Sequence, residues 1–112
     1  MTLPIVFDDR ASAELNLHLA YLASVNPASA HALSDAIASI LDLIADFPEL
    51  HEKYSGNVRR AVLARWSLGI FYEIMPNVLF VAAIADLRHD PAAIRHRLGL
   101  HEAGEDFASE QL

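Results

Sequence analysis

The stretch VRRAVLARWSLGIFYEIMPNVLFVAAIADLRHDPAAIRHRL, residues 58–98, decides the fold expected for this chain. In residues 66–74, apolar side chains recur at every second position, the period of a β-strand: Trp66, Leu68, Ile70, Tyr72 and Ile74. After a turn at Pro76 and Asn77, residues 78–85 (VLFVAAIA) are apolar at both parities, as in a strand covered on both faces. Residues 58–63 form a shorter β-branched run that is joined to residues 66–74 through Ala64 and Arg65. The stretch therefore predicts a three-strand meander.

The N-terminal half predicts one strand and two helices. Residues 3–7 are a short apolar run in which Pro4 removes a ladder donor, so this strand is expected near a sheet edge. Asp8 or Asp9 is the expected N-cap of a helix over residues 11–24. Asn26 and Pro27 start a second helix that ends at Phe47 and Pro48 and carries one apolar stripe: Leu33, Ile37, Ile40, Leu41 and Ile44. The short connection between the helices requires an antiparallel hairpin.

The predicted order is βααβββ, an α+β fold with a helical hairpin packed on a mainly antiparallel sheet. Because the hairpin returns the chain to the sheet end that it left, residues 58–63 are expected to run opposite to the first strand. The expected core packs Leu33, Ile37, Leu41 and Ile44 on Ile70, Tyr72, Phe80 and Ile84 or their opposite-parity neighbours. A short helix beginning at Asp90 and Pro91, with Ile94 and Leu98 inward and Arg95, His96 and Arg97 outward, covers part of the other sheet face. Residues 1–99 are expected to form a single domain, followed by a flexible acidic tail, residues 100–112.

Composition narrows the class of protein. A chain of 112 residues with 54% hydrophobic residues can bury one core, and the absence of cysteine excludes disulfides and thiolate chemistry. The first ten residues lack the basic and long apolar regions of a signal peptide, and no apolar run approaches the length of a membrane span. We therefore expect a soluble cytoplasmic protein.

The net charge of −7 is distributed unevenly along the chain. Residues 1–52 carry eight acids and one arginine, residues 53–97 carry seven bases and three acids, and residues 98–112 carry four acids and no base. A basic sheet on an acidic body is compatible with an acidic or polyanionic partner, although arginines on a solvated sheet face are also ordinary.

The remaining polar residues predict no metal site and no cofactor. His18 and His31 lie on separate expected helices, where histidines are usually surface or core residues. Asp90 is explained as a helix cap, and Asp86 as a partner of Arg88 or Arg65. The sequence contains no glycine-rich phosphate loop.

Four segments in this order of elements resemble the RelE/ParE superfamily of type II toxin-antitoxin toxins, and the ParE-like branch most: FPEL (47–50), VRRAVLARW (58–66), IFYEI (70–74) and IADLRHDPAAIRHRL (84–98). The resemblance covers nearly all of residues 3–98. The chain departs from the ParE-like pattern where it has Asp86 in place of a histidine, Arg88-His89 in place of a double arginine, and Trp66-Ser67 in place of Phe-Pro.

The resemblance implies a toxin, of the kind involved in plasmid stabilisation and growth arrest, that binds DNA gyrase without chemistry of its own and is neutralised by a cognate antitoxin. We expect the target-binding patch at the end of the last strand, where the helical hairpin cannot cover the sheet, from Arg88, His89 and Arg95. The expected antitoxin contacts are Arg59, Arg60 and Arg65, because they belong to the basic segment.

Two alternatives remain open from the residues. A ribosome-dependent mRNA endoribonuclease of the RelE kind needs cations for the scissile phosphate and a group that takes the 2′-hydroxyl proton. His89 and Tyr72 are the candidates for proton transfer, although Tyr72 shares its parity with Leu68 and Ile70 and is expected first in the core. The other alternative is a non-toxic interaction module that keeps the fold and the antitoxin groove.

Overall fold

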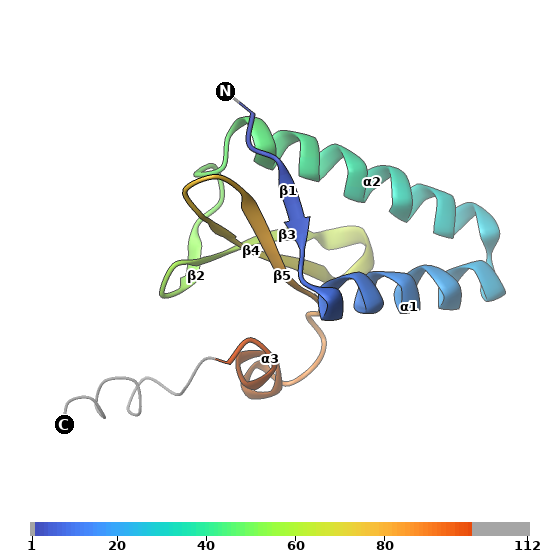
Figure 1. Ribbon diagram of the computed structural model, residues 1–112. Coiled ribbons are helices and arrows are strands. Elements are labelled where there is room, and N and C mark those ends of the chain that lie inside the picture. Colours follow the sequence, from blue (N-terminus) through green and yellow to red (C-terminus); the bar gives the residue numbers. More distant parts are fainter. Residues whose placement is uncertain (1, 100–112) are drawn as a thin grey trace.

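The computed structural model of the protein describes residues 2–99 (Figure 1). The expected acidic tail, residues 100–112, lies outside the described residues. In chain order the elements are β1 (Ile5–Phe7), α1 (Asp9–Val25), α2 (Pro27–Asp46), β2 (Lys53–Ser55), β3 (Val58–Leu63), the 3₁₀ helix η1 (Ala64–Trp66), β4 (Leu68–Ile74), β5 (Leu79–Asp86) and α3 (Pro91–Arg97).

The strands form one sheet in the order β1-β5-β4-β3-β2. β1 pairs with β5 in parallel, and the other neighbours are antiparallel. The α1–α2 hairpin lies on one side of this sheet and α3 on the other (Figure 1). The predicted α+β class and the mainly antiparallel sheet are confirmed.

Two expectations about the strands are corrected. The short strand β2, residues 53–55, was not predicted, because three residues with a lysine and a serine carry no apolar periodicity. β2 reverses into β3 through a turn in which Gly56 has φ 56°, a backbone conformation that glycine adopts without steric cost. This extra reversal makes β3 parallel to β1, so the expectation that residues 58–63 run opposite to the first strand is wrong.

The helical hairpin forms as predicted, with one difference at its first cap. The side chain of Asn26 accepts a hydrogen bond from the Ala28 amide at 3.1 Å, and Pro27 occupies the first turn of α2. Asp8 occupies the N-cap position of α1 without a hydrogen bond from its side chain to the helix.

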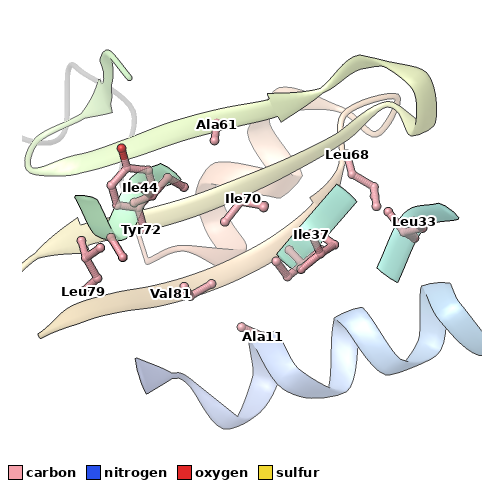
Figure 2. Packing of buried hydrophobic residues seen from close by; sticks show 12 residues of the cluster. Ala11, Leu33, Ile37, Ile44, Ala61, Leu68, Ile70, Tyr72, Leu79 and Val81 are labelled. Atoms are coloured by element: carbon pink, nitrogen blue, oxygen red, sulfur yellow. The ribbon is translucent and has the colours of Figure 1, made fainter. Parts of the chain in front are cut away.

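The main core joins α2 to the sheet (Figure 2). Leu33, Ile37 and Ile44 of α2 are buried with residues of β4 and β5: Leu68, Ile70, Tyr72, Leu79, Val81 and Ile84. Leu41 packs against this cluster and is only partly buried. By length and composition α2 resembles a membrane span, and several of its large apolar residues, among them Leu33, Ile37 and Ile44, are buried in the core that includes the sheet.

Val81 takes the core position that was first expected for Phe80. Phe71 pairs with Ala83 and Tyr72 with Val81, so Ala82 is an extra residue that forms a β-bulge in β5. The bulge reverses the parity of β5, and as a result Val81 and Ile84 both face the helical hairpin.

A smaller core lies on the opposite sheet face, where Phe71 and Ala83 are buried against Ile94 of α3. A Cβ at Gly69 would lie 2.9 Å from side-chain atoms of both Leu87 and Phe71, so a larger residue at this position of β4 would displace these side chains. The predicted cover of this face by the C-terminal helix is therefore confirmed.

Replacing Ile37, which is 5% exposed, by alanine is expected to lower the free energy of unfolding by about 2 to 5 kcal/mol, because it leaves a cavity. Leu43→Ala is the matched control on the same helix, since Leu43 is 38% exposed. Urea denaturation of the two variants measures the difference. An Ile37→Ala variant as stable as Leu43→Ala would contradict the packing of α2 on the sheet.

Candidate functional site

Past the end of β1, two charged side chains form hydrogen bonds with the backbone groups on the outer edge of β5. The Ile84 amide donates to Glu14 Oε1 at 3.0 Å, and Arg97 Nη2 donates to the Ala82 carbonyl at 3.0 Å. The same guanidinium donates to Glu14 through Nε at 2.6 Å and through Nη2 at 3.0 Å. Glu14 belongs to α1 and Arg97 to α3, so the pair holds both helices on one strand edge. We call this pair the edge clamp.

The edge clamp corrects the expectation that Arg97 points outward. The side chains of Arg97 and Glu14 are 16% and 27% exposed, respectively. The carboxylate and the guanidinium are partly buried, and they hydrogen-bond each other and two backbone groups. Loss of either side chain therefore leaves several polar groups without hydrogen bonds, which costs stability.

Arg97→Gln is therefore expected to lower the free energy of unfolding by about 1.5 to 3 kcal/mol, the usual range for hydrogen bonds to charged groups. In hydrogen exchange, Glu14→Ala should also accelerate exchange of the Ile84 amide, which loses its acceptor. Arg10→Gln is the control, because it removes an exposed arginine of α1. Equal effects of Arg97→Gln and Arg10→Gln on the free energy of unfolding would contradict a stabilising role of the clamp.

Next to the edge clamp, a cleft of about 250 Å³ lies between α1, the end of β5 and α3. Apolar residues form much of its lining: Leu17, Ile84, Ala85, Ala93 and Ile94. His18, Asp86 and His89 also line it, together with the two clamp residues. This arrangement gives an apolar hollow bordered by titratable groups.

The segment between β5 and α3 is held by Asp86. Its carboxylate accepts from Arg88 Nε at 2.9 Å, from Arg88 Nη2 at 2.7 Å and from the Arg88 amide at 2.9 Å. The hydrogen bonds from Arg88 hold the pKa of Asp86 well below its usual range. The predicted alternatives for Asp86 were Arg88 and Arg65, and the structure selects Arg88. Asp90 accepts from the Ala92 amide at 3.1 Å and caps α3, as predicted.

His18 of α1 faces this cleft, and burial lowers its pKa below the ordinary 6.5, while the charges of Asp86 and Glu14 act in the opposite direction. A histidine whose pKa is depressed in the folded state stabilises the fold above pH 6.5 and loses that contribution as the pH falls through the lower value. Acid therefore weakens the fold at this position.

A histidine NMR titration is expected to give His18 a pKa below 6.5. Asp86→Asn should lower it further, because it removes the largest of the attractive charges on the imidazolium. Asp9→Asn, also on α1, is the control and should leave the titration unchanged. A His18 pKa above 6.5, or one that rises in Asp86→Asn, would contradict this electrostatic picture.

The predicted target-binding residues divide between two places. Arg88 and His89 lie in the segment before α3, at the same end of the sheet as Arg65. The guanidinium of Arg65 lies 4.7 Å from the centroid of the Trp66 ring, and Trp66 and Arg88 line one small hollow. Arg95 instead lies with its guanidinium 5.9 Å from the ring of Tyr54 on β2.

The predicted antitoxin-binding arginines do not form one patch. Arg59 Nη1 donates to the carbonyls of His51 at 2.7 Å and Glu49 at 3.4 Å, so it fixes the segment before β2. Arg60 follows it on β3 and faces the other side of the sheet, with its guanidinium 5.1 Å from the Tyr54 ring. Arg65 lies in η1. Neither Tyr54 nor Glu14 stands in a recognisable sequence pattern, so neither was predicted to contribute to a site.

The two candidates for proton transfer differ in accessibility. Tyr72 is fully buried, its hydroxyl donates to the Pro48 carbonyl at 2.8 Å, and burial raises its pKa. It therefore lies in the core, the position expected for it first. His89 is exposed beside the cleft. Across residues 2–99, no three histidines or carboxylates are grouped so as to hold a metal ion.

Comparison with known proteins identifies the fold. No protein-family model matches the chain, and no curated protein does. A chain of a solved structure described as the chromosomal ParDE TA system from P. aeruginosa superposes with a TM-score of 0.66 at 13% sequence identity. The superposition covers 77% of the present chain and 97% of the ParDE chain. The chain therefore has the RelE/ParE-like fold that its sequence predicts.

Proposed function

We propose that this chain is the toxin of a type II toxin-antitoxin module, that it acts by binding DNA gyrase, and that a cognate antitoxin neutralises it in the cytoplasm. The observation that carries the proposal is the superposition on 97% of a ParDE chain. The agreement extends over a whole chain, so it concerns a complete domain and not a shared motif.

Binding is favoured over chemistry because the charged groups near the cleft are already paired. Arg97 is engaged by Glu14 and Arg88 by Asp86, which reduces the positive charge available to a scissile phosphate. The hydroxyl of Tyr72 is buried and bonded to a carbonyl. These features support a protein target more than an RNA substrate.

The proposed target-binding surface is the sheet end that contains η1 and the segment before α3. We call it the loop-end surface and define it by Arg65, Trp66, Arg88 and His89, with Tyr21 of α1 exposed beside them. Guanidinium groups next to large aromatic rings are typical of the energetically dominant positions of protein interfaces. Its apolar and cationic groups fit a protein surface with acidic side chains.

Induced expression of the chain is expected to arrest growth, and the purified protein is expected to inhibit supercoiling by gyrase. The double variant Arg65→Ala/Arg88→Ala should lose both effects while keeping the fold, because it removes the exposed cations of the loop-end surface. Arg60→Ala/Arg95→Ala is the matched control, since it removes two arginines at a different place. Co-expression of the neighbouring gene product should relieve the arrest by wild-type protein.

The outcomes separate the alternatives. Cleavage of mRNA on ribosomes with intact supercoiling would replace the gyrase proposal by endoribonuclease activity. A folded protein that neither arrests growth nor affects either target would leave a non-toxic interaction module. If growth arrest persisted in Arg65→Ala/Arg88→Ala and disappeared in Arg60→Ala/Arg95→Ala, the target-binding surface would lie around Arg60 and Arg95 instead.

A further inference from the structure

The outer face of α1 carries an apolar stripe. Within residues 2–99, the large apolar side chains most exposed to solvent are Leu17, Tyr21 and Val25, at 74%, 68% and 65%. They stand four residues apart, so they lie above one another on one side of the helix. We call these three residues the α1 stripe.

The α1 stripe lies where the helical hairpin projects from the sheet. The structure describes all of α1, and Ala11 is its one buried residue. Leu15, Leu19 and Leu22 pack against the core and are only partly buried. Figure 1 shows that the ends of α1 and α2 that meet at the turn reach past the sheet. Within residues 2–99, this part of α1 therefore faces solvent on its outer side.

The segment that carries the stripe is uncharged. Residues 15–34, from the second half of α1 into α2, contain no aspartate, glutamate, lysine or arginine. The charged side chains that border the stripe, Glu14 and Arg88, are paired with Arg97 and Asp86. An acidic or basic partner therefore meets no unpaired opposite charge here. A second copy of the same segment meets an uncharged apolar face and no like-charge repulsion at the contact.

The spacing of the stripe is symmetric about Tyr21. Two copies of α1, packed antiparallel about a two-fold axis at Tyr21, place Leu17 against Val25 of the partner subunit and the two tyrosine rings against each other. A tyrosine buries about 150 to 250 Å² in a contact, and the whole stripe offers roughly 300 Å² of apolar area per copy. With the exposed Ala20 and Ser24 beside it, the contact stays below about 1,200 Å², the size of weak and transient interfaces.

We propose that the α1 stripe is a self-association surface, through which two copies of this chain form a weak, antiparallel two-fold dimer. Salt screens the repulsion between two chains of charge −7 and leaves an apolar contact in place, so the dimer should strengthen as the ionic strength rises. The dimer buries Tyr21, which borders the loop-end surface, so self-association and target binding at that surface exclude each other. Only this last consequence rests on the proposed function.

Sedimentation equilibrium of the full-length chain measures the dimer. With increasing concentration, the mass should rise from the 12.3 kDa of one chain toward twice that value. Tyr21→Glu should hold the mass at that of one chain, because it places two carboxylates at the two-fold axis. Leu50→Glu is the matched control, since Leu50 is an exposed apolar residue on the segment before β2, and this variant should associate like the wild type.

A charge exchange tests the antiparallel arrangement. Leu17→Lys and Val25→Glu should each abolish the dimer, because each puts an unpaired charge against an apolar side chain. A mixture of the two variants should restore it, since the introduced lysine of one chain then lies against the introduced glutamate of the other. Both positions are exposed, so each variant should keep the circular dichroism spectrum of the wild type.

The outcomes decide between a second copy and another partner. A mass of one chain at every concentration, a dimer that survives Tyr21→Glu, or a mixture of Leu17→Lys and Val25→Glu that stays monomeric would each overturn the inference. If the wild-type chain stayed monomeric and bound the neighbouring gene product more tightly than Tyr21→Glu does, the α1 stripe would be a surface for that protein instead.

Discussion

The outer edge of β5 imposes the constraint on which the rest of this structure depends. β1 is three residues long and pairs with β5 through Leu79, Phe80 and Val81, so the strand continues past its partner with backbone groups that still require hydrogen bonds. Glu14 and Arg97 supply them. Because these residues come from α1 and α3, satisfying one strand edge also fixes two helices on opposite sides of the sheet. The cleft beside β5 lies between these helices and is lined by both clamp residues.

The fold could be predicted from the sequence wherever the spacing of apolar residues and the residues that end a helix or strand indicate the same element. The stripe of α2 and the alternation of residues 66–74 gave the helical hairpin and the meander, because each pattern reflects a face that must be buried. The direction of β3 could not be predicted, since it depends on a strand of three residues that has no apolar pattern. Val81 and not Phe80 takes the core position because of the bulge at Ala82. The run VLFVAAIA is apolar at either parity, so its pattern does not locate a bulge.

The candidate site was predictable in part. Asp86 with Arg88, and Asp90 as a helix cap, are local relationships between residues two apart. The cap was expected from the chain, and Arg88 was one of the two partners expected for Asp86. The positions of the arginines were not expected, because adjacent residues of a strand point to opposite faces and Arg59 and Arg60 therefore serve different surfaces. Arg95 joins Arg60 at Tyr54 only because α3 crosses the sheet there, which is a tertiary relationship that no local pattern contains.

One departure from the ParE-like pattern near the end of β5, the aspartate at position 86, is explained by its ion pair with Arg88. The chain has an aspartate where a histidine is usual, and an arginine followed by a histidine where two arginines are usual. The carboxylate of Asp86 is 13% exposed, so a negative charge at this position needs a partner, and the guanidinium of Arg88 binds it through two nitrogens. Once Arg88 is committed to Asp86, its charge is less available to a polyanion. The aspartate that departs from the pattern is therefore held by the arginine that follows it, and this ion pair fixes the segment between β5 and α3.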